Sequence, residues 1–171
     1  CVRTNDMDKA EKILKKVIEL NPEFALAHKD LGIIYLQKRL FDYAQDEFGQ
    51  ALKLAPDNFD ILFEYANYLH ATTKFKEADE YYQRALAIDP HHTDALGFSA
   101  LNKIHLNDLD KAYEQIEHAL HHETNNDFMY FIAGKIKFLQ KEYEDAKMYF
   151  VKSYEILLQH IHNHVLWLQL Y

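Results

Sequence analysis

The chain has 171 residues, and its 27 aspartates and glutamates outnumber its 19 lysines and arginines, so the formal net charge is −8. This acidic balance disfavours a nucleic-acid surface, which needs surplus cations, and also docking onto an anionic membrane. Four glycines, three prolines and one cysteine disfavour a turn-rich all-β fold or a phosphate-binding loop and exclude an internal disulfide. No apolar run reaches the ~18 residues that a membrane helix requires, so we expect a mostly helical protein without membrane insertion.

A period of 34 residues runs along the chain. Alanine recurs with this step at Ala10, Ala44, Ala78, Ala112 and Ala146. A large apolar residue stands four positions after each of them, at Leu14, Phe48, Tyr82, Ile116 and Phe150. The prolines keep the same step, at Pro22, Pro56 and Pro90. Self-similarity at a fixed period is the signature of a repeat architecture.

Each repeat predicts two amphipathic helices. In the second helix, Ala44, Phe48 and Ala51 recur on one helical face, where small alanines let a neighbouring backbone approach. Proline then ends the helix, because it lacks an amide hydrogen and restricts the residue before it. Thr124 and Leu158 stand at the two later sites where this proline is expected.

The register divides the chain into six segments. Residues 1–24 predict a second helix whose first helix is missing. The full units are 25–58 and 59–92, followed by the degenerate units 93–126 and 127–160. Residues 161–171 predict a capping helix or the start of a further repeat. Because the chain begins and ends within a repeat, we expect it to be part of a longer protein.

Two units carry the marker residues of a known repeat. The markers of the first are Leu31, Gly32, Tyr35, Ala44, Phe48, Ala51 and Pro56, and those of the second are Tyr65, Ala66, Leu69, Ala78, Tyr82, Ala85 and Pro90. With these residues the chain resembles the tetratricopeptide repeat (TPR) family. The resemblance implies an all-α, right-handed α-solenoid whose first helices line a concave groove. It also implies a non-catalytic scaffold that binds a peptide or helix of another protein.

The predicted binding groove follows the first helices. Its members are Lys29, Phe63, Asn67, His70, Phe128, Phe131 and Lys135. The three phenylalanines would anchor an apolar peptide, because aromatic rings bury much area at low entropic cost. The alternative is that these rings close the contacts between adjacent first helices. Acidic neighbours, Asp60, Glu64 and Asp94, favour a ligand with basic flanks.

Eleven histidines raise the question of a metal site. His118 and His122 are spaced one helical turn apart, with His121 beside them, and His91 and His92 lie in the turn one repeat earlier. A second group is His160, His162 and His164. Two imidazoles form a zinc site only with a third or fourth ligand and a second shell. The prediction is therefore a polar helix exterior, with no metal and no cofactor.

Nucleophilic catalysis finds little support in the sequence. The two serines, Ser99 and Ser153, occupy small-residue packing positions, and neither lies in a nucleophile elbow. The many carboxylates match the solvated surface of an acidic protein, and no pair of them indicates separated pKa values. We therefore expect no enzymatic activity within these residues.

Two alternative functions stay open at this point. The repeats are typical also of a regulatory or targeting module of a larger enzyme, whose catalytic domain would lie outside the chain. They also allow homo-oligomerisation, as a homodimer through the apolar ends at residues 6–20 and 161–171. The single cysteine and the lack of a visible signal favour a cytoplasmic location.

Overall fold

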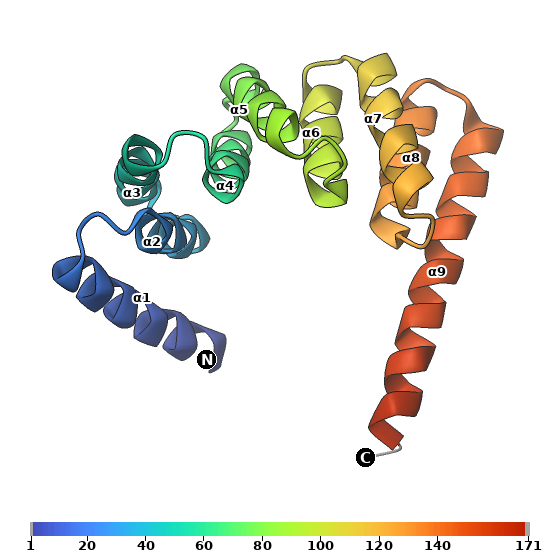
Figure 1. The fold of residues 1–171 in the computed structure, drawn as a ribbon. Coiled ribbons are helices and arrows are strands. Elements are labelled where there is room, and N and C mark those ends of the chain that lie inside the picture. The colour runs from blue at the N-terminus through green and yellow to red at the C-terminus, as the bar shows by residue number, and fades with distance from the viewer. Residues whose placement is uncertain (1, 170–171) are drawn as a thin grey trace. The chain divides into compact units, whose positions relative to one another are not determined.

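The computed structural model describes the backbone of residues 2–169 and the side chains of residues 6–162. Within residues 2–169 the chain forms nine α-helices and no strand (Figure 1). Their bounds are α1 Val2–Leu20, α2 Ala25–Gln37, α3 Phe41–Leu54, α4 Phe59–Ala71, α5 Phe75–Ile88, α6 Thr93–His105, α7 Leu109–His122, α8 Asp127–Leu139 and α9 Tyr143–Gln169. The predicted all-α class is confirmed. Cys1 and the apolar side chains predicted for residues 163–171 lie outside the described part.

The helices keep the period of the sequence. The first helices of the repeats begin at Ala25, Phe59, Thr93 and Asp127, and the second helices begin at Phe41, Phe75, Leu109 and Tyr143. Both series therefore advance in steps of 34 residues. α1 precedes the first complete pair and packs on α2.

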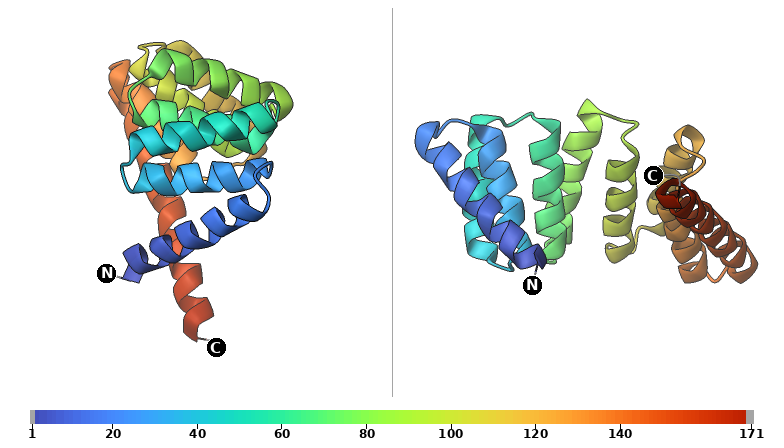
Figure 2. Two further views of the ribbon diagram at one scale, coloured as in Figure 1. Left: turned by 90° about the vertical axis from the view of Figure 1, so that its left-hand side faces the viewer. Right: turned by 90° about the horizontal axis from the view of Figure 1, so that it is seen from below.

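The chain divides into two compact units, Cys1–Asp89 and Pro90–Tyr171. The first unit holds α1 to α5, and Figure 2 shows α2, α3, α4 and α5 lying side by side within it. The second unit holds α6 to α9, in which α6 packs on α7 and α8 packs on α9.

The repeated alanines and large apolar residues form the core. In the first unit Phe48 and Tyr82 are fully buried, and the ring of Phe48 lies 5.5 Å from that of Tyr68. A Cβ atom added to Gly32 would stand 3.1 Å from the Phe48 ring, so α2 and α3 approach closely there. In the second unit Ile116 is fully buried in the same position of its repeat. The small-and-large alternation thus sets the spacing of the paired helices.

The turn inside each complete repeat has one recurring geometry. Arg39, Thr73, Asn107 and Lys141 have positive φ angles of 60°, 63°, 60° and 67°. In the first of these turns, the amide of Leu40 donates to the carbonyl of Tyr35 at 2.9 Å, and the amide of Arg39 donates to Leu36 at 3.0 Å. These two bonds make a Schellman motif, which satisfies the last carbonyls of a helix. Sequence analysis did not predict this motif, because glycine, the usual residue in this conformation, is absent from all four positions.

The second helices end in two ways. α3 and α5 end two residues before Pro56 and Pro90, as predicted, and α7 ends at His122 although Thr124 replaces the proline. Asn126 begins the next helix by accepting a hydrogen bond from the amide of Met129 at 3.2 Å. α9 continues to Gln169, so no turn interrupts the backbone at residue 160, where the last repeat was expected to end.

Candidate functional site

The predicted groove residues of the first unit lie on α2 and α4. Phe63 is half-buried, and its ring stacks on Phe59 with a centroid separation of 5.9 Å and packs beside Tyr82 at 6.2 Å. Asn67 accepts a hydrogen bond from the Tyr82 hydroxyl at 2.7 Å and donates one to Glu64 at 3.3 Å. Phe63 and Asn67 therefore join α4 to α5, whatever else they contact.

The charges on this surface are mostly negative. Lys29 forms an ion pair with Asp30 at 3.0 Å. Burial raises the pKa of Glu64 above its usual value, and the charge of Asp60 adds to that rise while Lys29 opposes it. His70, in the last turn of α4, packs its ring edge-on against the first residue of α5. A half-buried carboxylate beside two further acids, Asp30 and Asp60, favours a cationic contact on this surface.

The predicted residues of the second unit lie on α8. Phe128 is half-buried, with its ring 5.7 Å from that of Phe98 on α6. Phe131 is 48% exposed and lies 5.9 Å from the ring of Phe150 on α9. Lys135 is half-buried one helical turn further along α8. The seven predicted residues thus form two groups, four on the first unit and three on the second.

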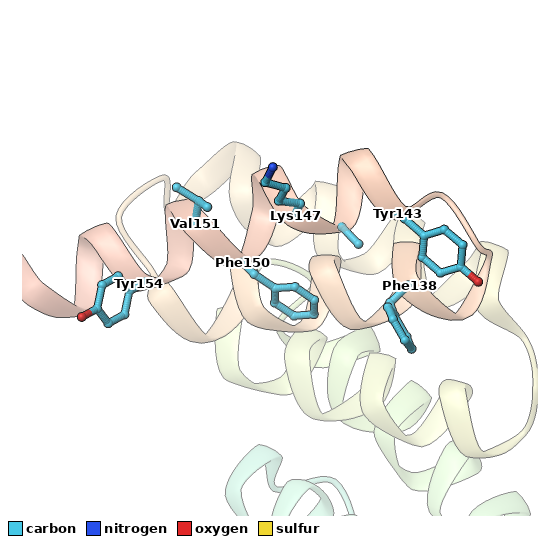
Figure 3. Close-up of a pocket in the computed structure, with 7 residues that line it drawn as sticks. Phe138, Tyr143, Lys147, Phe150, Val151 and Tyr154 are labelled. Carbon is cyan, nitrogen blue, oxygen red and sulfur yellow. The ribbon is translucent and has the colours of Figure 1, made fainter.

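An apolar pocket of about 520 Å³ lies on α9 and the end of α8 (Figure 3). Its lining consists of Phe138, Tyr143, Ala146, Lys147, Phe150, Val151 and Tyr154. Phe138 is 56% exposed and Tyr154 is 61% exposed, so large rings face solvent at this surface. None of the seven predicted groove residues lines the pocket. An exposed apolar surface of this kind marks an interaction site in many proteins.

The repeat register explains why this surface is apolar. Phe150 stands three repeats after Phe48, since 150 − 48 = 102 = 3 × 34. In the first unit the α4 residues Tyr65 and Tyr68 cover Phe48, with ring centroids 5.9 Å and 5.5 Å away, and Phe48 is fully buried. Phe150 on α9 is only half-buried, and no such pair of tyrosine rings covers it among the described residues. The sequence identified Phe150 as a core position and missed its partial exposure.

The second unit also gathers three histidines. His91, His118 and His122 each offer one ring nitrogen, and these three atoms all lie within 4.8 Å of one another. The sequence indicated the pair His118 and His122 but did not bring His91 to it. The arrangement supplies the third imidazole whose lack argued against a metal. The second histidine group stays outside such a cluster, with His160 beside Asp127 at 3.5 Å, while His164 lies beyond the described side chains.

Both serines make hydrogen bonds inside the fold. Ser99 is fully buried and accepts a hydrogen bond from Gln115 at 3.0 Å. Ser153 donates to the backbone carbonyl of Asp127 at 2.8 Å. These bonds tie α6 to α7 and α8 to α9, which is a packing role.

Comparison with known proteins gives a consistent result. Three family models described as tetratricopeptide repeat match residues 30–93, 69–130 and 1–24. None of the described helices is both long and apolar enough to cross a membrane.

Individual relatives show the same architecture. The type IV pilus assembly protein PilF of Pseudomonas aeruginosa is 22% identical over 154 residues, which cover 87% of this chain and 60% of that protein. The structure of PilW, a type IV pilus biogenesis factor, is similar with a TM-score of 0.85 and 23% identity, over 91% of this chain and 72% of that one. YrrB, described as having an unusual peptide-binding site, is similar with a TM-score of 0.73 and 23% identity, over 94% and 82% of the chains. At these identities the structural likeness shows the fold. The chain spans about three fifths of the length of PilF.

Proposed function

Because the chain belongs to the tetratricopeptide repeat family, we propose that it is a protein-interaction scaffold whose α8–α9 surface binds an amphipathic helix of another protein. The single observation that carries this proposal is the apolar pocket between Phe138 and Tyr154. Binding would bury the exposed rings of the pocket and so remove apolar surface from contact with water. This removal is the main favourable contribution to the free energy of association.

The first unit indicates what kind of helix fits the pocket. There α4 covers the face of α3 with Tyr65 and Tyr68, one helical turn apart, whose rings stack on each other 5.7 Å apart and both contact Phe48. The Tyr68 hydroxyl also donates to the backbone carbonyl of Phe41 at 3.3 Å. By analogy with Phe48, the other phenylalanine at this repeat position, the partner helix should present two aromatic residues at i and i+3 to Phe150. This is the helix-in-groove mode of recognition.

The first-helix groove is the second candidate surface. The observation in its favour is Phe131, which is 48% exposed and is therefore available to a ligand. On the first unit, the acidic group of Asp30, Asp60 and Glu64 would favour basic residues in a peptide bound to that unit. Phe63 contributes less to this proposal, because its ring already packs against the core.

A cross-linked pull-down from native cell extract tests both surfaces with four baits: wild type, Val151→Asp, Phe131→Asp and Gln83→Asp. Val151 lines the pocket and is 50% exposed, so a carboxylate there disturbs binding more than folding. Gln83 is the matched control, because it is exposed at the same repeat position of α5. We expect a partner that Val151→Asp loses and the other three baits retain, with unchanged helicity by circular dichroism.

The other outcomes discriminate between the candidates. Loss of the partner from Phe131→Asp alone would move the binding site to the first-helix groove. If all four baits captured the same partners, neither surface would be the binding site, and both proposals would be wrong. The alternatives of a targeting module in a larger enzyme and of a homodimer through the apolar ends stay predictions, as does the cytoplasmic location.

A further inference from the structure

We propose that His91, His118 and His122 form a binding site for one zinc ion. His91 lies in the turn between α5 and α6, and the other two histidines lie one helical turn apart on α7. The Nδ1 atom of His91 is 3.0 Å from the Nε2 atom of His118. The ring of His122 lies 4.3 Å from that of His91 and 5.1 Å from that of His118, centroid to centroid. Three imidazoles therefore converge from two segments of the second unit.

The repeat framework itself brings two of these positions together. In the first unit the equivalent positions hold Asp57 and Arg84, which form an ion pair at 3.6 Å. Arg84 also donates to the backbone carbonyl of Pro56 at 2.8 Å, so the turn is tied to the second helix. One repeat later the same two positions hold His91 and His118. The backbone thus positions this pair of imidazoles in the same way that it positions an ordinary ion pair.

His122 is a departure from the other repeats. The equivalent residues are Leu54, Ile88 and Ile156, all of them aliphatic. Ile156 is buried, with 2% of its surface exposed, whereas Leu54 and Ile88 are 39% and 48% exposed. In the second unit the aliphatic side chain is replaced by an imidazole directed to two others. The histidine is therefore a change of chemical type at a position that is aliphatic in the other three repeats.

The distances suit a tetrahedral zinc ion after small side-chain rotations. With Zn–N bonds of about 2.0–2.1 Å, ligand nitrogens in a tetrahedral site stand roughly 3.3 Å apart. The His91–His118 separation of 3.0 Å is slightly shorter, and the 4.8 Å limit for the whole group is longer. His91 and His122 are exposed, so their rings are able to turn and a water molecule has access to the fourth position. Neutral imidazole is a good ligand for zinc.

Isothermal titration of the full chain with ZnCl₂, after removal of metal by a chelator, tests the site. We expect the binding step of highest affinity to have a stoichiometry of one zinc ion per chain. The variants His91→Ala and His122→Ala should each weaken that binding by more than about tenfold, since a change in the outer shell alone costs that much. His121→Ala is the matched control, because His121 is exposed on the same helix but is not in the group. It should bind zinc like the wild type.

Cobalt gives an independent readout of the geometry. Co²⁺ bound by three imidazoles and water in a tetrahedral site absorbs strongly in the visible, whereas hexahydrated Co²⁺ does not. We expect this absorption with wild type and His121→Ala, and its loss with His91→Ala. Full-strength zinc binding by His91→Ala would overturn the proposal, because α7 alone would then suffice. Equal weakening by His121→Ala would overturn it as well, since binding would then follow the number of histidines. Circular dichroism of each variant verifies that it is folded.

Discussion

Thr73 holds a left-handed backbone conformation that is costly for a β-branched side chain. Its φ angle is 63°, and its amide donates to the carbonyl of His70 at 3.0 Å. The turn geometry is imposed by the Schellman hydrogen bonds, which recur in all four complete repeats. Asn107 meets the same demand at lower cost, because asparagine visits this region more readily. The four turns therefore differ in strain although their backbones are alike.

We expect Thr73→Gly to raise the free energy of unfolding by about 1 kcal/mol, because glycine adopts positive φ without a Cβ clash. Asn107→Gly should change it by less. Thr72→Gly is the control in the adjacent position, where φ is −92° and the hydroxyl donates to Tyr68 at 2.9 Å, and it should destabilise the protein. Urea unfolding of the three variants measures their free energies of unfolding and so tests this order of stability. A loss of stability in Thr73→Gly would contradict the assigned turn strain.

α9 is longer than the other helices because its sequence lacks the usual stop. α3 and α5 end two residues before a proline, and the equivalent position in α9 is Leu158. No glycine follows it either. Leu158 is 46% exposed, and Ile161 is 51% exposed, so the extension is not held by burial of these side chains in the described chain. Its helical state therefore depends on local propensity, unlike that of the residues before Ile156.

Leu158→Pro tests this account of α9. Proline would remove one amide hydrogen and clash with the carbonyl of Tyr154, so the helix should end near Ile156 as in the other repeats. We expect faster amide exchange at residues 157–162 and lower helicity, with the protection of the buried face around Ala146 retained. The conservative control Leu158→Met should leave both unchanged. Loss of protection throughout α8 and α9 would show instead that the extension supports the packing of the second unit.

The sequence predicted the features that depend on residues close together in the chain, and it did not predict those that depend on contacts between distant segments. The repeat, the helix pairs and the buried Ala44–Phe48 face follow from residue types at fixed spacing, and the structure confirms them. The exposure of Phe150 depends on whether another helix covers it, which its own helix does not encode. The meeting of His91 with His118 needs the turn and the second helix to be placed together, over a separation of 27 residues. The sequence therefore predicted features that lie within one helix, and it missed sites that are formed by residues from separate segments.

The repeat organisation also predicts how damage spreads through the molecule. In a repeat protein each element is stabilised mainly by its neighbours, so a local defect should loosen nearby helices most. Gly134→Ala is such a defect, because its Cβ atom would stand 2.7 Å from ring atoms of Phe150 on α9. We expect a loss of about 1–3 kcal/mol, which is typical of overpacking. Amide exchange should quicken most in α8 and α9 and least in α2 and α3.

Gly49→Ala is the matched glycine for this comparison. Nothing lies within 4 Å of the Cβ atom it would gain, so the substitution should stabilise α3 by about 0.5–1 kcal/mol through helix propensity alone. Amide exchange should then slow most in the first unit, whereas Gly134→Ala should speed it most in the second unit. If both variants instead changed protection equally over all described helices, the chain would unfold as one cooperative body. The division at Asp89 would then have no counterpart in its stability.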